Sequence, residues 1–448
     1  MPSPAEQRLA TPTRSQFETA QPEAAQFEDA SARVMKRAVE LAACTDLEGG
    51  LQRLFCSPAM QETHRRLQGW MHAAGMATRI DAAGNLIGRR AAAAGGGRSV
   101  LIGSHLDTVV NAGRFDGTLG VLLGLGLAEL CQQAGASLPV SLDVIGFSEE
   151  EGIRYQSPYI GSRALAGDLR PGDPLLERLD DGGVRLADAL THFGCDTAEL
   201  NTAAYAASDV AAFIEPHIEQ GPVLEEAGLP LGVVTGVAGQ TRACFRFTGE
   251  MGHAGTVPMA LRKDPMPAAA RFIVEVEQAA KRRPGLLATV GRLELTPNVA
   301  NVIPAEVAVR LDLRHIDDSE RETGFVKVHR AAMQIAKQAG IGCRLEWCEQ
   351  QAATVCDAGC QAILGDAIAE EGLPTHAMAS GAGHDAVVMA NRFPSGILFL
   401  RCAGGVSHHP DESVSQADVA TALRVLWRAL LKIADREPQP AGGLATRA

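Results

Sequence analysis

The sequence predicts an α/β fold in which a largely parallel mixed sheet, flanked by helices, is interrupted by a smaller α+β domain. Two apolar runs, residues 99–105 (SVLIGSH) and 141–148 (SLDVIGFS), have the continuous hydrophobicity of strands that are buried on both faces. The Gly- and Leu-rich segment 117–134 between them predicts a buried helix. Apolar strands that alternate with helical segments indicate βαβ units and therefore a parallel sheet.

The pattern changes after residue 232, where alternating strands replace the continuous apolar runs. Three segments alternate apolar and polar side chains, as half-buried strands do: residues 241–250, 288–296 and 306–315. Two segments have the period of amphipathic helices: residues 266–283 and 321–340. The order of these elements is strand-helix-strand-strand-helix-strand, with the last strand following the second helix. That order predicts a ferredoxin-like insert.

The length of the chain also indicates two domains. At 448 residues it exceeds what one hydrophobic core usually organises. We predict one domain from residues 31–232 and 354–436, and an inserted domain from residues 233–353. Residues 1–30, which are polar and rich in Ala, Pro and Gln, and residues 437–448 are predicted to be tails.

Charge and composition exclude several classes of partner. A net charge of −12 and a pI near 5.5 argue against binding to nucleic acid or to an anionic membrane. The first 30 residues lack a signal-peptide core, and the longest apolar stretch, residues 120–130, is too short to span a bilayer. The ten cysteines form no paired C-x₂-C motif, so they are interpreted as reduced thiols. We therefore expect a cytoplasmic protein.

Five residues scattered along the chain are candidate metal ligands: His105, Asp116, Glu151, His217 and His408. His105 ends the first apolar strand, and Glu151 is the last of three glutamates after the second. The carboxyl ends of strands are where open α/β sheets place ligand and catalytic groups. Imidazole and carboxylate without cysteine suit zinc, manganese or a related hydrolytic metal. A shared carboxylate could hold two ions about 3.5–4 Å apart.

Each candidate has an ordinary structural interpretation as well. A lone histidine after a strand more often forms a hydrogen bond in a core or at a surface than binds a metal, and three successive glutamates are usually a solvated strand end. Asp107 favours the metal interpretation, because it lies two residues beyond His105 on the same side of an extended chain. There its carboxylate could accept the other ring N–H of the histidine, as is usual for a metal ligand.

The ordered motifs of this chain resemble those of a known family. They are GSHLDTVVNAGRFDG, FSEEEGIRY, HIEQGPVLE, GVAGQTR, GHAGTVPMALRKDP, NVIPAEVAVRLDLRH, SGAGHDA and GGVSHHPDE. From about Val34 to Ile433 the chain resembles the dinuclear amidohydrolases that include allantoate amidohydrolase, N-carbamoyl-L-amino-acid hydrolase and β-ureidopropionase, the allantoate-cleaving members most of all. One departure is Ala305, where the family often has glycine after NVIP.

The resemblance implies two divalent ions in each chain, with Mn²⁺ expected and Zn²⁺, Co²⁺ or Ni²⁺ as alternatives. Asp116 would bridge the ions, His105 and Glu151 would serve opposite ions, and His217 and His408 would complete the two ligand sets. Glu150 would be the general base. In the peptidase relatives the base and ligand pair stands one residue earlier, which would make it Glu149 and Glu150; the following residues, GIRYQSPYIGS, favour the first register.

The resemblance also assigns substrate-binding residues. His253 in GHAGTVPM would bind substrate or stabilise the tetrahedral intermediate. Arg314 and Asn301 would hold the substrate carboxylate, since a planar guanidinium grips a carboxylate through two parallel hydrogen bonds. Gln220 is a further candidate for the ureido group. His384 and Asp385 would only support the final metal ligand.

The implied reaction is metal-dependent hydrolysis of the ureido C–N bond of allantoate, a small substrate that carries a carboxylate. An N-carbamoyl-L-amino-acid hydrolase or a β-ureidopropionase is the alternative, because the same site serves all three. A catalytically silent binding relative is the alternative of another class. The resemblance further implies a homodimer formed through the insert, with His253 acting either in its own chain or in its partner's site.

Overall fold

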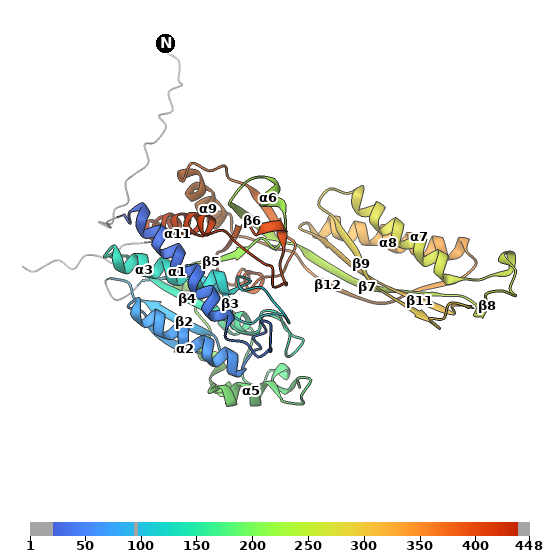
Figure 1. The fold of residues 1–448 in the computed structure, drawn as a ribbon, viewed down its shortest axis with the longest axis horizontal. Helices are drawn as coiled ribbons and strands as arrows, with labels where there is room; N and C mark the ends of the chain where they lie inside the picture. The colour runs from blue at the N-terminus through green and yellow to red at the C-terminus, as the bar shows by residue number, and fades with distance from the viewer. Residues whose placement is uncertain (1–20, 94–96, 438–448) are drawn as a thin grey trace, which may run out of the picture. The chain divides into compact units, whose positions relative to one another are not determined.

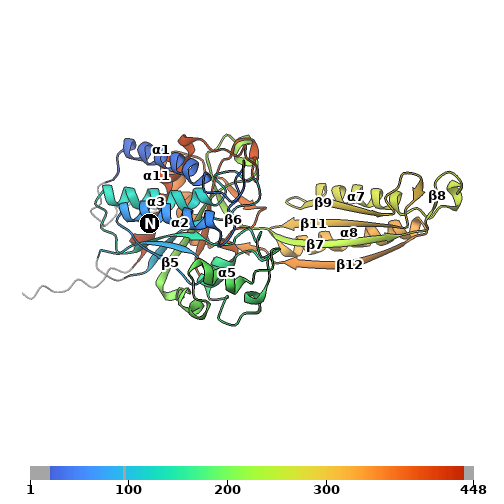
Figure 2. The same ribbon diagram turned by 60° about the horizontal axis from the view of Figure 1, so that its bottom comes forward.

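The computed structural model describes residues 21–93 and 97–437, which form two compact units (Figures 1 and 2). Unit 1 comprises the described residues of Met1–Thr235, Cys356–Met378 and His384–Ala448, and unit 2 comprises Gly236–Val355 and Ala379–Gly383. Unit 2 begins and ends close to the predicted insert. It also takes in Ala379–Gly383, which no sequence pattern indicated.

Unit 1 is built on a mixed sheet with strand order β1-β2-β4-β3-β5-β15-β6. The strands are β1 (Ala77–Ile80), β2 (Leu86–Arg90), β3 (Ser99–His105), β4 (Ser141–Phe147), β5 (Val210–Ile218), β15 (Ser395–Leu400) and β6 (Leu231–Val237). The central pairs β4-β3, β3-β5 and β5-β15 are parallel, whereas the outer pairs are antiparallel. Short strands β13 (Thr354–Val355) and β14 (Ala377–Ser380) pair with β6. The predicted α/β class is confirmed.

Helices cover both faces of this sheet, which is why every residue of β3 and β4 is buried. Helices on one face share a single apolar core with the sheet: α1 (Ala24–Ala42), α2 (Pro58–Ala73), α3 (Thr118–Gln133), α9 (Ala358–Glu370) and α11 (Gln416–Arg436). A second core forms around α4 (Ile160–Ala166) and α5 (Leu186–Phe193). The short helices α6 (Val223–Glu226) and α10 (Ala386–Met389) complete the unit.

Helix α1 corrects the predicted N-terminal tail, which was placed at residues 1–30. The helix begins at Ala24, where the side chains of Glu23 and Gln26 form a capping box. Phe27, Ala30 and Val34 are buried in the unit 1 core. The polar composition of this segment therefore hid an amphipathic face, and only residues 1–20 of the predicted tail lie outside the described residues, together with 438–448 at the other end.

Unit 2 has the predicted ferredoxin-like order of elements. Its main elements are β7 (Gly239–Thr248), α7 (Pro265–Lys281), β9 (Leu287–Thr296), β11 (Glu306–His315), α8 (Asp318–Gln338) and β12 (Gly342–Gln351). The antiparallel sheet has the order β12-β7-β11-β9, and α7 and α8 pack on one face of it around a core rich in phenylalanine (Figure 1). A separate two-residue pair joins β8 (Gly252–His253) to β10 (Val302–Ile303).

Candidate metal centre

Parallel strands bring the predicted ligands of unit 1 to one edge of its sheet. His105 is the last residue of β3, His217 is the residue before the last in β5, and Glu150 and Glu151 follow β4. Because β4, β3 and β5 are parallel neighbours, their carboxyl ends meet at the same edge. Asp116 enters this edge from the turn that precedes α3.

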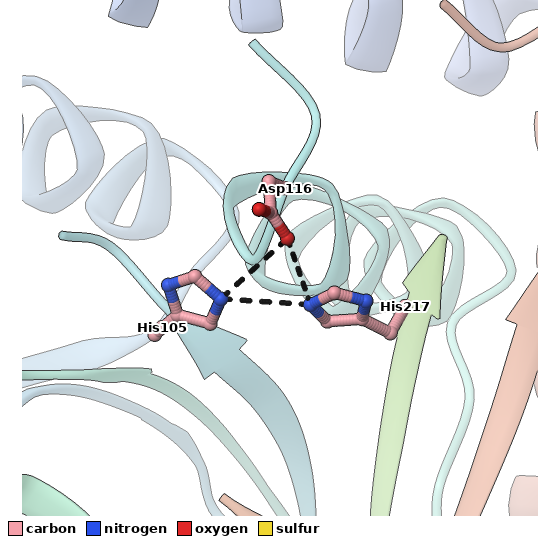
Figure 3. A group of neighbouring side chains, drawn as sticks. All are labelled: His105, Asp116 and His217. Carbon is pink, nitrogen blue, oxygen red and sulfur yellow. Dashed lines mark hydrogen bonds and ion pairs between the residues drawn. The ribbon is translucent and has the colours of Figure 1, made fainter. Parts of the chain in front are cut away.

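His105, Asp116 and His217 form the inner part of the cluster (Figure 3). Asp116 Oδ1 lies 3.2 Å from His217 Nε2 and 3.8 Å from His105 Nε2. The two Nε2 atoms are 3.5 Å apart, and all three side chains are buried. Three potential ligand atoms therefore converge on one point from a helix N-terminus and two strands.

The main chain sets the tautomer of both histidines. Nδ1 of His105 lies 2.9 Å from the carbonyl oxygen of Asp107, and Nδ1 of His217 lies 2.9 Å from that of Ile218. A carbonyl oxygen only accepts hydrogen bonds, so each Nδ1 carries the hydrogen and each neutral ring turns an Nε2 lone pair toward the cluster. Two lone pairs and a carboxylate oxygen that face one another are stabilised by a positive charge between them, which a proton or a metal ion can supply. The residues therefore fit a divalent metal ion.

Two further groups of ligand atoms overlap the first. Asp116 Oδ2 lies 3.2 Å from His408 Nε2, which lies 3.5 Å from Glu151 Oε1. His105, Glu150 and Glu151 form the other group; within each group, the potential ligand atoms all lie within 4.8 Å of one another. Asp116 belongs to two of the three groups. Glu151 also belongs to two groups, but the two oxygens of Asp116 each lie 3.2 Å from a different histidine, His217 and His408, which suits a carboxylate shared by two ions.

The centre concentrates buried negative charge. Eight carboxylates lie in or beside it: Asp107, Asp116, Glu149, Glu150, Glu151, Glu215, Asp385 and Glu412. Burial and then Glu151 raise the pKa of Glu150 well above its usual value, and burial and then Asp116 raise that of Glu151 to about 8. These shifts mean that the ionised carboxylates are destabilised unless cations accompany them.

The nearby carboxylates also affect the pKa of His217, on β5. Burial lowers the pKa of His217, but its hydrogen bond with Asp116 and the charge of that residue outweigh burial and raise the pKa to about 9. For His408 the hydrogen bond with Asp116 is the largest cause, and its pKa is also raised to about 9. Both positions therefore attract positive charge, for which a proton and a metal ion compete.

The three successive glutamates have different surroundings. Glu149 belongs to none of the three ligand groups found among the described residues. Its Oε1 accepts the N–H groups of Arg154 and Tyr155 at 2.8 and 2.9 Å, so this side chain stabilises the loop that follows. Glu150 and Glu151 face the histidines instead. This geometry favours the register in which Glu150 is the base and Glu151 the ligand.

Asp107 makes a different contact from the one predicted. Its carboxylate Oδ1 lies 3.8 Å from His105 Nδ1, too far for a hydrogen bond, and the ring nitrogen contacts the main-chain oxygen of Asp107. The carboxylate instead accepts the N–H groups of Glu150 and Glu151, both at 3.0 Å. These amides follow the end of β4, and buried amides require an acceptor. Asp107 therefore orients the glutamate loop.

Glycine is required at position 117, next to the bridging candidate. Gly117 has a φ of +58°, and a Cβ there would lie 2.5 Å from three atoms of the His105 ring. Its N–H also donates to His217 Nε2 at 3.3 Å. The glycine after Asp116 thus lets the start of α3 approach both histidines.

Gln220 lies beside the cluster with a φ of +59°. Its Nε2 donates to Asp116 Oδ1 and to Ser407 Oγ, both at 3.1 Å. Its buried Oε1 has no hydrogen-bond partner among the described residues. Next to Asp116, Gln220 therefore presents an acceptor without a hydrogen-bond partner in the described part of the chain.

His384 lies beside His217. The ring of His384 packs edge-on against His217, with centroids 4.5 Å apart. Glu215 accepts the N–H of Ala386 at 2.8 Å and the hydroxyl of Ser104 at 2.9 Å, which ties the start of α10 to the sheet. The motif thus contacts the ligand candidate on β5, and its expected support of the final ligand, His408, stays a prediction.

Sequence reasoning missed Glu412, a buried residue at the end of the last quoted motif. Its carboxylate accepts the N–H groups of Phe115 and Asp116 at 2.8 and 3.0 Å. The available signal was its position four residues after His408. That signal was weak, because the partners lie almost 300 residues earlier in the sequence.

The remaining predicted residues belong to unit 2. His253 in β8 pairs with Val302 in β10, so Asn301 lies next to it. Arg314 lies near the other end of β11, where Asp312 accepts two hydrogen bonds from it at 2.9 and 3.1 Å. Unit 2 therefore brings Asn301 and His253 together and keeps Arg314 apart from both.

Fold and site together define a metal-dependent hydrolase class, and comparison with known proteins identifies the family. Residues 101–432 match the model of peptidase family M20/M25/M40. Allantoate deiminase 2 from Glycine max is 38% identical over 86% of this chain and 86% of its own length. An N-carbamoyl-L-amino acid amidohydrolase from Geobacillus stearothermophilus is 39% identical over 87% of this chain and 95% of its own. The crystal structure of a hydantoinase/carbamoylase-family amidase from Burkholderia multivorans is similar over 90% of this chain and 98% of its own length. The TM-score is 0.85 and the sequence identity is 30%.

The chain therefore belongs to peptidase family M20/M25/M40. Its relatives are named as amidohydrolases, so the prediction of a hydrolase that acts on C–N bonds is confirmed. The resemblance to the allantoate and N-carbamoyl amidohydrolases is confirmed as well. Among residues 21–93 and 97–437, no helix is both long and apolar enough to cross a membrane.

Proposed function

We propose that this protein hydrolyses the terminal ureido C–N bond of allantoate with two divalent ions, Mn²⁺ by preference, as a step of purine catabolism. The single observation that carries the proposal is the set of three overlapping ligand groups, two of which share Asp116 while the third contains Glu150. The similarity to allantoate deiminases supports the choice of substrate. Ammonia, carbon dioxide and ureidoglycine are the products.

The ions would be held by His105, Asp116 and His217 on one side and by Asp116, Glu151 and His408 on the other. When bound, they would lower the pKa of a water molecule and polarise the ureido carbonyl. Glu150 takes the proton from this water and returns it to the departing nitrogen. The carbamate that is left loses carbon dioxide.

The substrate carboxylate would be bound by Arg314 and Asn301. In the structure the guanidinium of Arg314 is oriented by two hydrogen bonds to Asp312 and one to the carbonyl oxygen of Gly381 at 2.6 Å. An arginine fixed in this way loses little freedom when it binds a carboxylate. The free Oε1 of Gln220 would accept a ureido N–H, and His253 would donate to the developing oxyanion.

An N-carbamoyl-L-amino acid or β-ureidopropionate is the alternative substrate. The Geobacillus enzyme is as similar to this chain as the soybean one, and both kinds of substrate carry a ureido group and a carboxylate. A cytoplasmic location is also proposed, because all ten cysteines are free thiols.

A substrate panel tests the proposal. Purified protein with added Mn²⁺ is assayed for ammonia release from allantoate, N-carbamoyl-L-amino acids and β-ureidopropionate. We expect the highest kcat/KM with allantoate. A higher kcat/KM with an N-carbamoyl amino acid would move the protein to the alternative, and no release from any ureido compound would refute the reaction.

We also propose a homodimer in which the insert of one chain completes the site of its partner. Arg314 lies eight residues beyond Glu306, the first residue of β11, whereas Asn301 precedes that strand. At about 3.3 Å per residue, eight residues of strand span roughly 26 Å. One carboxylate cannot contact both side chains of the same insert over such a distance. If Arg314 and Asn301 hold the same substrate, they come from two chains.

The surroundings of His253 support such a contact. Its Nδ1 accepts the N–H of Gly255 at 3.0 Å, so Nε2 carries the hydrogen and remains available as a donor. Three large apolar side chains near it are highly exposed: Met251 at 64%, Met259 at 77% and Leu261 at 71%. Exposed apolar residues that cluster on one segment are typical of a protein interface.

Mixing two inactive variants tests the shared site. His253→Ala and Glu150→Gln chains are co-expressed and the mixed dimers assayed. If His253 acts in the partner's site, each heterodimer has one site with both defects and one with neither, so random pairing restores activity to about a quarter of wild type. If His253 acts in its own chain, both sites of each heterodimer stay defective.

The matched control replaces His253→Ala with His408→Ala. Glu150 and His408 lie in the same unit, so every site of those heterodimers keeps one defect and no activity should return. Absence of recovery with His253→Ala in demonstrated heterodimers, or a chain that is monomeric at assay concentration, would reject the shared site.

A further inference from the structure

Glu412 connects two segments that carry predicted metal ligands. Its side chain is only 1% exposed. Oε1 accepts the N–H groups of Phe115 and Asp116 at 2.8 and 3.0 Å, and Oε2 accepts the hydroxyl of Ser407 at 3.1 Å. The Glu412 carboxylate thus contacts the main chain of Asp116 and the side chain of Ser407, which precedes His408.

Glu412 is not itself placed as a ligand. It belongs to none of the ligand groups found among the described residues, and both of its oxygens already accept hydrogen bonds from protein donors. Hydrogen bonds to an ionised acceptor are about twice as strong as neutral ones, so these contacts suit a residue that holds two loops together.

His408 depends on such support. Its side chain is 50% exposed and its φ is +55°, an uncommon conformation for a residue other than glycine. An exposed side chain has few packing contacts of its own, so its position follows from the turn that carries it. Glu412 closes that turn, because its N–H donates to the carbonyl oxygen of His409 at 3.0 Å.

The segment before Asp116 passes very close to the Glu412 side chain. A Cβ on Gly113 would lie 2.4 Å from the Cβ, Cδ and Oε1 atoms of Glu412. Only glycine lets the chain pass this close. A side chain at position 113 would displace Glu412 without removing its charge, which provides a second and independent way to perturb it.

We infer that Glu412 is a positioning residue that sets the separation between Asp116 and His408, and thereby the affinity for the ion that these two residues share with Glu151. The inference rests on the dinuclear centre of the proposed function. Replacing a residue that orients a metal ligand typically costs 10- to 100-fold in metal affinity. The loss should be larger for this ion than for the other, which is also held by His105 and His217; neither histidine has a hydrogen bond or ion pair with Glu412 among the described residues.

The test is metal binding rather than turnover. Metal-stripped wild type, Glu412→Ala and Glu412→Gln are titrated with Co²⁺, and binding is followed by calorimetry and by the visible absorption of the bound ion. Wild type should bind two ions. Glu412→Ala should bind one of them at least ~10-fold more weakly. Glu412→Gln should lie closer to wild type, because its amide oxygen still accepts both N–H groups and its NH₂ group donates to Ser407.

Two further variants separate positioning from general stability. Gly113→Ala should weaken the same ion as Glu412→Ala does. Asp81→Asn is the control, since buried Asp81 accepts the N–H groups of Ala83 and Asn85 and contacts no predicted ligand. It should lower the thermal unfolding temperature and leave both Co²⁺ affinities unchanged.

Wild-type affinity for both ions in Glu412→Ala would overturn the inference and leave Glu412 a purely structural residue. Should Glu412→Ala fail to fold, wild-type affinity for both ions in Gly113→Ala would overturn it equally. Fewer than two ions in wild type would instead refute the dinuclear centre of the proposed function, so the two failures are distinguishable.

Discussion

Replacing Glu150 with glutamine should lower kcat by at least ~10²-fold while the metal content stays at the wild-type level. Glutamine has nearly the same shape as glutamate but cannot take a proton from water. Burial, and then the neighbouring carboxylates, raise the pKa of Glu150, so its proton affinity is high. Steady-state kinetics with allantoate and metal analysis of the same sample provide the measurement.

Glu149→Gln is the matched control for Glu150→Gln, because it removes the same charge one residue earlier. Glu149 accepts two main-chain N–H groups from Arg154 and Tyr155, so its replacement should lower stability more than kcat. If Glu150→Gln loses a metal ion and Glu149→Gln loses only rate, the assigned register is wrong by one residue.

Removal of the metal ions should abolish activity and lower the unfolding temperature together. Glu151 shares one ligand group with Asp116 and another with Glu150; Asp116 and Glu150 are buried, and the side chain of Glu151 is only 12% exposed. Without cations these carboxylates repel one another or must bind protons, whereas a bound ion stabilises only the folded state. Dialysis against a chelator, followed by calorimetry and assay, measures both effects.

Addition of Mn²⁺, Co²⁺ or Ni²⁺ to the metal-stripped protein should restore both the activity and the unfolding temperature. The five predicted ligands are histidines and carboxylates, of which His408 is exposed, so the ions should exchange. Recovery of the unfolding temperature without recovery of activity would assign the ions a structural role only.

The fold was predictable because its central elements have strong local patterns. The runs at 99–105 and 141–148 are continuous apolar strands, and β3 and β4 occupy them within one residue. The same strands predicted where His105 and Glu151 would lie, since a parallel sheet collects its carboxyl ends at one edge. Helix α1 was missed because its buried face is formed by small residues as well as Phe27 and Val34.

The contacts that orient the ligands were not predictable in the same way. Which donors Asp107 and Glu412 accept depends on where main-chain N–H groups are left without partners after the strands and turns have formed. The separation between Asn301 and Arg314, by contrast, follows from the strand predicted at residues 306–315, whose bounds β11 matches. The functional roles of these residues stay predictions.

Titration of the metal-stripped chain with Mn²⁺, with allantoate turnover and bound metal measured in each sample, tests the central claim most directly. We expect two ions to bind per chain, and ammonia release from allantoate to appear only as the centre fills. Full turnover in protein that contains no metal, or saturation of activity at one ion per chain, would contradict a dinuclear amidohydrolase centre.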